Sequence, residues 1–87
     1  MANRAHGMLK SIHSPEQLAF RRLLIEVRRK AGLTQAELAK RLKKPQSFVA
    51  KYEGGERRID VLEFIAITQA MRAEPTKLLK TLIQQIH

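Results

Sequence analysis

One stretch sets the architecture expected for this chain: TQAELAKRLKKPQSFVAKYEGG, at residues 34–55. It opens with Thr34 and Glu37 at the spacing of a helical capping box, and apolar residues follow at helical intervals. Pro45 must end that helix, because its ring clashes with the carbonyl four residues back, yet a proline suits the first turn of a new helix. The stretch therefore predicts two short helices in close succession, at about residues 35–42 and 45–53.

The second of these helices has two different faces. On a helical wheel, Val49 and Tyr52 fall on one side with Phe48 at its edge, so this side is expected to pack inward. The opposite side carries small or polar residues, which are Gln46, Ser47, Ala50 and Lys51. Gln can bond the edge of adenine, Lys can donate to guanine and Ser can do either, so this side fits the major groove of B-DNA. The wheel alone leaves an ordinary solvated face as the alternative.

Helix signals also flank this stretch on both sides. Upstream, residues 14–17 (SPEQ) supply an N-cap Ser, a proline at the first helical position and a Gln placed for a capping box, and the helix ends at Gly32. Downstream, Asp60 and Glu63 form the capping box of a fourth helix, and a Glu-Pro pair at 74–75 opens a fifth. The expected fold is all-α, a compact domain of five helices.

Helical periodicity also selects the side chains expected in the core. The expected inward stripes are Phe20, Leu24, Val27 and Ala31 in the first helix, Gln35, Leu38, Ala39 and Leu42 in the second, Val61, Phe64, Ile65, Thr68 and Met71 in the fourth, and Leu78, Leu79, Leu82, Ile83 and Ile86 in the fifth. The fifth stripe spans more than one face of its helix. Part of it is therefore expected to remain uncovered in a monomer.

The chain has a strong basic charge for its length. Among 87 residues, 17 Lys and Arg face 8 Asp and Glu, a net charge of +9. Seven of the cations lie between Lys40 and Arg58, around the second predicted helix of the opening stretch. Such a concentration indicates an anionic partner, and a surface tuned for solubility is the alternative.

Length and patterning divide the chain into two parts. Residues 1–13 have no sustained periodicity and are expected to form a flexible basic arm, while residues 14–87 form one small domain. Arg4 or Lys10 in the arm would suit a minor groove, but simple disorder is the better interpretation.

Several classes of protein are disfavoured by composition. The chain has no Cys, and its three His lie near the termini without ligand spacing, so no metal site is expected. No Gly-rich phosphate loop and no nucleophile beside a base is present, so neither catalysis nor a cofactor is expected. No apolar run is long enough for a spanning helix or a signal peptide, which predicts a soluble, cytoplasmic protein.

The segments GLTQAELAKRL, PQSFVAKYEGG and DVLEFIAITQAM resemble, in this order, three helices of the phage-repressor and Cro-like (XRE) helix-turn-helix regulators. The resemblance runs from about Leu24 to Leu79. It implies a lambda-repressor-like DNA-binding domain in which the second and third helices form the helix-turn-helix. It also implies a sequence-specific regulator of transcription, acting as a repressor or autoregulator on double-stranded DNA.

The resemblance assigns roles to individual residues. Together with the outward face of the helix, it indicates base contacts for Gln46, Ser47 and Lys51. Gln35 resembles the family's phosphate clamp, and the positions of Lys43, Lys44, Arg57 and Arg58 favour phosphate contacts, with solvent-facing charges as the alternative for the two arginines. The resemblance also implies a structural ion pair between Arg28 and Glu53. Two independent surface charges are the alternative to that pair. For Phe48, packing at the edge of the core fits better than contact with a thymine methyl.

This sequence departs from the family pattern at two positions of the turn. Lys43 stands where the family often has a Gly in the left-handed conformation, so strain of about 1 kcal/mol is expected. Pro45 stands where a Ser or Thr usually caps the recognition helix, and it cannot cap. The start of that helix, and with it the reach of Gln46, is therefore expected to differ.

Partners follow from the same resemblance. A homodimer formed through the last helix would place two recognition helices about 34 Å apart on a palindromic operator. Two other interpretations stay open: an antitoxin-like protein whose main partner is another protein, and a controller protein of a restriction system. Double-stranded RNA is a weaker candidate, because its major groove is too deep and narrow for a helix.

Overall fold

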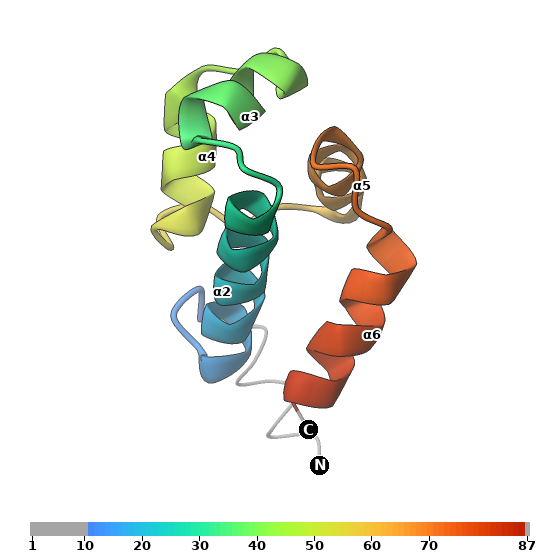
Figure 1. Ribbon diagram of the computed structural model, residues 1–87. Coiled ribbons are helices and arrows are strands. Elements are labelled where there is room, and N and C mark those ends of the chain that lie inside the picture. Colours follow the sequence, from blue (N-terminus) through green and yellow to red (C-terminus); the bar gives the residue numbers. More distant parts are fainter. Residues whose placement is uncertain (1–10, 87) are drawn as a thin grey trace.

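The computed structural model describes residues 11–86, and within them it contains five α-helices and no strand (Figure 1). The all-α, five-helix prediction is therefore confirmed. The helices are α2 (Pro15–Lys30), α3 (Gln35–Leu42), α4 (Gln46–Glu53), α5 (Val61–Ala70) and α6 (Pro75–Gln85). Residues 1–10, with Arg4 and Lys10 of the predicted arm, lie outside the described residues.

Side-chain caps are present at the starts of α2, α3 and α5. Thr34 and Asp60 each accept a hydrogen bond from the backbone N–H three residues on, and Glu37 and Glu63 close the two capping boxes. At α2 only half of the box forms. Ser14 accepts from the Gln17 N–H, while its own N–H donates to the Ser11 carbonyl, so the reciprocal bond from Gln17 is replaced by a local turn.

The turn between α3 and α4 shows both departures from the family pattern. Lys43 adopts the left-handed conformation, with φ 56° and ψ 41°, as the C-cap of α3. Pro45 is the N-cap of α4 and makes no side-chain capping bond. The expectation that Pro45 is the first helical residue is thus off by one position. Its extended ψ of 154° puts it outside the helix, which begins at Gln46.

The core is formed by apolar residues from all five helices and from the α2–α3 loop. Its buried members are Leu23, Leu24, Leu33, Leu38, Ala39, Val49, Tyr52, Phe64, Ile67, Met71 and Leu78. One expectation for α5 was wrong, because Val61 is 72% exposed. Ile67, which is not in the expected stripe, is fully buried. Val61 is the first residue of α5 and projects beyond the packed part of the helix. Ala31 is also exposed, because it lies past the end of α2 as its C-cap.

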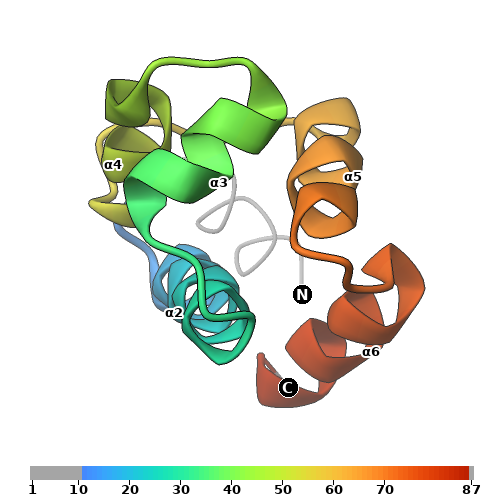
Figure 2. The same cartoon turned by 45° about the horizontal axis from the view of Figure 1, so that its top comes forward.

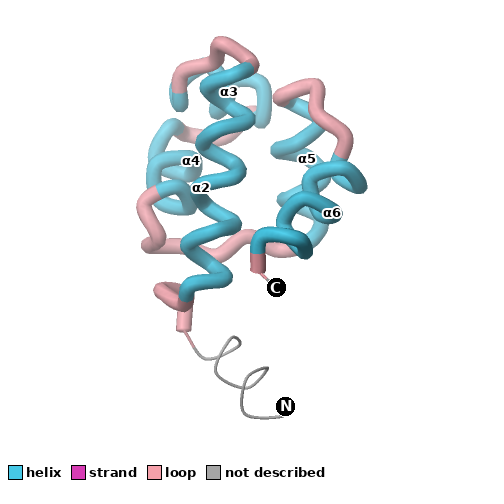
Figure 3. The backbone as a smooth tube through the Cα atoms, turned by 60° about the horizontal axis from the view of Figure 1, so that its bottom comes forward, coloured by secondary structure: helices cyan, strands magenta, loops and turns pink. Residues whose placement is uncertain are grey.

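The helices are arranged so that α4 lies at one edge of the molecule. α3 crosses α4, and α2 packs against both α4 and α6. α5 and α6 lie on the opposite side of α2 from α4 (Figures 1 and 2). A view from below shows the same order, with no described element on the outer side of α4 (Figure 3). The small Ala39 is buried where α3 approaches α4, which permits this close crossing.

Within residues 11–86, no helix is long and apolar enough to cross a membrane.

Candidate nucleic-acid interface

The faces of α4 are those that the helical wheel predicts. Val49 is fully buried and Tyr52 is 2% exposed, so the inner side is locked into the core. Gln46, Ser47, Ala50 and Lys51 are all exposed on the outer side. Their side chains are therefore available to a large ligand that approaches α4 from outside the molecule.

A buried ionic network fixes the C-terminal end of α4. Arg28 of α2 donates from Nε to Glu53 Oε2 at 2.8 Å and from Nη2 to Glu53 Oε1 at 3.1 Å. The predicted ion pair between these residues is therefore present and bidentate, and both residues are buried. Arg28 also donates from Nη1 to the Leu33 carbonyl at 2.8 Å. One guanidinium thus joins α2, the α2–α3 loop and α4, and its hydrogen bonds to Glu53 raise its pKa.

Gln35 belongs to the same network. Its side-chain Nε2 donates to Glu53 Oε1 at 2.8 Å, which ties the start of α3 to the end of α4. The sequence places Gln35 at a phosphate contact and gives no sign of this bond. The two roles are compatible, because the bond orients the side chain while its amide oxygen and the first backbone N–H groups of α3 remain at the helix N-terminus.

The α3–α4 turn carries two exposed cations, Lys43 and Lys44. The Lys44 ammonium lies 5.7 Å from the centre of the Phe48 ring. Phe48 is half-buried and packs edge-on against Tyr52, with ring centres 5.6 Å apart. The packing role expected for Phe48 is therefore present, and its ring also faces the cations beside α4.

Beyond α4, Arg57 binds other groups of the same domain. Its guanidinium donates to both carboxylate oxygens of Glu63, at 3.0 and 2.7 Å, and to the Arg58 carbonyl at 2.8 Å. Its Cζ atom lies 4.8 Å from the centre of the Phe48 ring. From the sequence, Arg57 was expected only at a phosphate contact and Glu63 only as a helix cap. The six-residue spacing across a helix start gave no periodic signal of this pair.

Arg58 is exposed in the same loop and lines a small, partly open cavity. The cavity, of about 10 Å³, is lined by residues of α2, α4 and this loop, including Phe20, Tyr52 and Ile59. The Tyr52 hydroxyl is buried without a hydrogen-bond partner, and burial raises its pKa. The cavity is of a size to hold one water molecule, which would satisfy such a hydroxyl.

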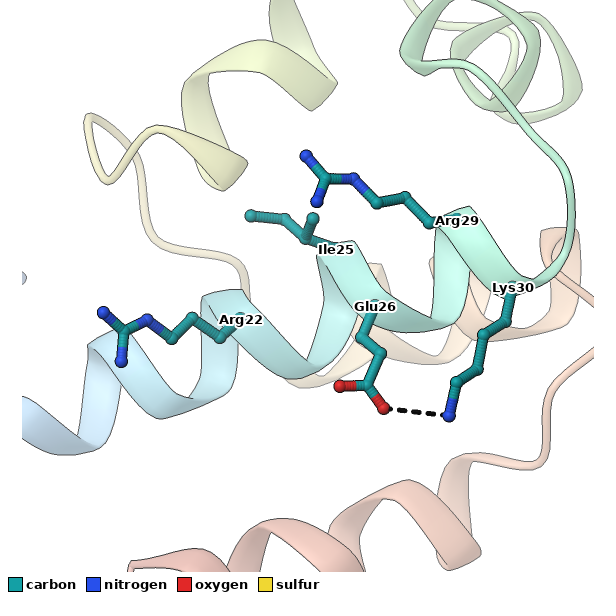
Figure 4. A pocket seen from close by; sticks show the side chains of 5 residues that line it. All are labelled: Arg22, Ile25, Glu26, Arg29 and Lys30. Atoms are coloured by element: carbon teal, nitrogen blue, oxygen red, sulfur yellow. Dashed lines mark ion pairs between the residues drawn. The ribbon is translucent and has the colours of Figure 1, made fainter.

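A shallow depression of about 380 Å³ lies on the outer face of α2 (Figure 4). It is lined by Arg22, Ile25, Glu26, Arg29 and Lys30. Glu26 and Lys30 form an exposed ion pair at 3.0 Å, so the carboxylate is already neutralised. The arginines of the depression make this part of the α2 surface positively charged. The lining residues form no acid–base pair suited to catalysis.

No group of three or more potential metal ligands comes together within residues 11–86. The exposed His13 lies in the turn before α2. His6 and His87 lie outside the described residues.

Comparisons with known proteins agree with this architecture. Residues 24–78 match the family model described as helix-turn-helix. An XRE-family like protein from Pseudomonas syringae pv. tomato str. DC3000 is 46% identical, with a TM-score of 0.80 over 85% of this chain and 90% of the other. A search of curated proteins finds no significant match.

Two restriction-modification controller proteins are also similar. C.AhdI from Aeromonas hydrophila is 30% identical, with a TM-score of 0.63 over 68% of this chain and 86% of its own. C.Esp1396I, solved as a tetramer in complex with its natural 35 base-pair operator, is 18% identical, with a TM-score of 0.76 over 85% of this chain and 97% of its own. At that identity the second likeness concerns the fold alone.

Proposed function

We infer the function from one premise: this chain belongs to the XRE-type helix-turn-helix family. It is a DNA-binding regulator of transcription. We propose that it recognises a specific double-stranded operator by placing α4 in the major groove. The observation that carries this proposal is the outer face of α4, where four exposed side chains project from the edge of a strongly basic domain.

Base recognition is assigned to Gln46, Ser47 and Lys51 of α4. Gln46 and Ser47 occupy the first turn, which is the part of a recognition helix that reaches furthest into the groove. Lys51 lies one turn later on the same exposed side. Gln is suited to adenine and Lys to guanine, while the small Ala50 lets the helix approach the base edges closely.

Phosphate contacts are assigned to residues that frame α4. Lys43 and Lys44 precede it, Arg58 follows it, and Gln35 lies at the N-terminus of α3. Such contacts supply most of the affinity and carry no sequence information. The Arg28–Glu53–Gln35 network supports this arrangement, because it holds the two helices at one angle before DNA binds.

We further propose that the protein binds as a homodimer through the exposed apolar side of α6. Leu79 and Ile83 of this helix are 44% and 53% exposed. A two-fold dimer would cover them and match a palindromic operator. C.Esp1396I, a protein of the same fold, is solved as a tetramer in complex with its operator, which supports binding by more than one copy.

Selection from a random duplex library tests the proposal. The expected result is a palindromic motif whose half-sites are centred about 10 base pairs apart, or a multiple of that spacing. Enrichment of no motif would contradict sequence-specific recognition. A single half-site would retain recognition and contradict the homodimer.

Lys51→Ala separates base contact from phosphate contact. It should relax preference at one base pair by about 1–3 kcal/mol, because the lost bonds go to one base edge. Lys44→Ala is the matched control, since it removes the same charge from the turn and should weaken all sequences alike. Equal weakening of specific and random DNA by Lys51→Ala would withdraw its assignment to a base.

A controller protein of a restriction system is the second candidate, favoured by the 30% identity to C.AhdI. An antitoxin-like protein is the third, and co-purification of a stoichiometric partner would favour it. We expect no enzymatic activity, because the family and fold are those of DNA-binding regulators. We expect the protein to act in the cytoplasm, where operator DNA is found.

A further inference from the structure

We propose that Glu63 withholds Arg57 from the DNA backbone and so limits the sequence-independent part of DNA binding. The inference rests on the proposed function. It adds Glu63 as a residue that determines specificity without touching DNA. Its basis is the arrangement of Arg57, Glu63 and Phe48 between the end of α4 and the start of α5.

Most of the donors of Arg57 are already used. Nη1 donates to Glu63 Oε1 and to the Arg58 carbonyl, and Nη2 donates to Glu63 Oε2. A guanidinium has five N–H donors, so three are engaged and the fork that would grip a phosphate is occupied by a carboxylate. To bind a phosphate with this fork, Arg57 must first leave Glu63.

Glu63 cannot follow Arg57 towards DNA. Its Oε1 also accepts the backbone N–H of Asp60 at 2.9 Å, which closes the capping box of α5. Its own backbone N–H donates to the Asp60 side chain at 2.7 Å. The hydrogen bond from the Asp60 N–H therefore fixes the Glu63 carboxylate at the first turn of α5.

Phe48 holds the guanidinium from the side of α4. The Arg57 Cζ atom lies 4.8 Å from the ring centre, within the range of a cation–π contact. The ring is itself braced edge-on by the buried Tyr52. Arg57 is thus held by two fixed groups, a ring on α4 and a carboxylate on α5, and its charge is neutralised within the domain.

This neutralisation has a consequence for specificity. Phosphate contacts strengthen binding to every sequence alike, and each one adds about 0.9 to the dependence of log K on log salt concentration. An Arg57 released onto a phosphate would raise affinity for random DNA as well as for the operator. By holding it, Glu63 leaves a larger share of the affinity to the base contacts of α4.

The test is a double-mutant cycle of wild type, Glu63→Gln, Arg57→Gln and the double variant, measured on a random-sequence duplex over a salt series. Glutamine keeps an oxygen that can accept the Asp60 N–H, so the cap of α5 is retained. Glu63→Gln should bind random DNA several-fold more tightly at 50 mM salt. The gain should shrink about threefold by 200 mM salt, the effect of one added phosphate contact. With Arg57→Gln already present, Glu63→Gln should have almost no effect.

Glu37→Gln is a matched control, because Glu37 closes the equivalent capping box of α3 without binding an arginine. An equal gain from Glu37→Gln, or an equal gain with and without Arg57, would show a general charge effect and overturn the proposal. Unchanged binding by Glu63→Gln would overturn it too. Thermal melts of all variants establish that each is folded.

The same measurements separate this inference from the proposed function. If wild type binds its selected operator and Glu63→Gln changes nothing, only the inference fails. If wild type binds no duplex, both fail. NMR of the DNA-free protein adds a readout of the pair itself: the Arg57 Nη protons should exchange slowly in wild type and rapidly in Glu63→Gln. Rapid exchange in both would overturn the proposal.

Discussion

Arg28 is buried, in contrast to the exposed cations Lys43, Lys44 and Arg58 around α4. It reaches Glu53 through two bonds and the Leu33 carbonyl through a third, and its side chain is only 10% exposed. The network is costly to interrupt, because removing one partner leaves a buried charge without compensation. The network stabilises the fold mainly because each buried charge in it has a partner, and less through net attraction between the charges.

Arg28→Leu should therefore lower the free energy of unfolding by about 3–5 kcal/mol, the usual cost of breaking a buried ion pair. The measurement is urea unfolding followed by circular dichroism. Arg29→Leu is the control, since the neighbouring Arg29 is exposed and the same change should have little effect. Equal effects of the two substitutions would mean that the Glu53 pair contributes no special stability.

Lys43 carries a local conformational cost. Lys43 has a positive φ of 56°. A residue with a Cβ atom in this left-handed region costs about 1–2 kcal/mol, and glycine avoids this cost because it has no Cβ. Lys43→Gly should raise the free energy of unfolding by about 0.5–1 kcal/mol after the larger chain entropy of glycine is included. Lys44→Gly, where φ is negative, should instead destabilise.

Both glycine variants remove one cation from the turn, so both should weaken DNA binding to a similar degree. Thermal melts and a salt series of binding constants would measure the two effects separately. If Lys43→Gly lowered the melting temperature as much as Lys44→Gly, the turn would not be strained at Lys43.

α4 is less well capped than α3, the other helix of the helix-turn-helix. It has eight residues and no side-chain bond at its N-cap, whereas α3 begins with a complete capping box. α4 depends instead on packing of Val49 and Tyr52 and on the network at Glu53. Packing and the network thus stabilise the centre and C-terminal end of α4, while its N-terminal end, which is proposed to enter the major groove, lacks a side-chain cap.

Pro45→Ser should supply the missing cap. The extended backbone of residue 45 is that of an N-cap, so a serine hydroxyl can accept an N–H of the first turn. Compared with Pro45→Ala, which has the same gain in chain flexibility, the serine variant should be about 1 kcal/mol more stable. Urea unfolding measures the difference, and equal stability of the two variants would contradict the capping argument.

Two carboxylates make the stability of the whole molecule sensitive to acid. Hydrogen bonds from Arg57, and next from the Asp60 backbone, hold the pKa of Glu63 below its usual range. Bonds to Thr34 lower the pKa of Glu37 in the same way. A lowered folded-state pKa contributes stability that is complete above the unfolded value of about 4.3 and is lost as the pH falls through the lowered value.

Stability should therefore be flat near neutral pH and fall below about pH 4. Glu63→Gln should lose less stability than wild type between pH 6 and pH 3, because it has one fewer carboxylate to protonate. Urea unfolding at both pH values measures the loss. An identical loss in the variant would show that the Arg57–Glu63 pair does not contribute to acid sensitivity.

The proposed dimer uses the exposed apolar side of α6. Ile83→Gln should weaken the proposed dimer and its operator binding together, with little effect on folding, because Ile83 is more than half exposed in the monomer. Sedimentation and operator titration measure the two effects. Lys80→Gln, an exposed polar neighbour on the same helix, should leave the dimer intact. A dimer unaffected by Ile83→Gln would place its interface elsewhere.

Helix positions, caps and the two faces of α4 could be predicted from sequence because they depend on neighbours within four residues. Thr34 with Glu37, Asp60 with Glu63, and the spacing of Val49 and Tyr52 all act at helical intervals. The Arg28–Glu53 pair was accessible only through the family resemblance, since the two residues are 25 positions apart.

Other features required the packed structure. Glu63 caps α5 from within its own helix, and that much is visible in the sequence. Two further contacts depend on how α3, α4 and α5 pack together. Glu63 also binds Arg57 beside the Phe48 ring, and Gln35 donates a hydrogen bond to Glu53. The exposure of Val61 and the burial of Ile67 have the same cause. Periodicity gives the phase of a helix, but the extent of contact with neighbouring helices decides which residues of that phase are buried.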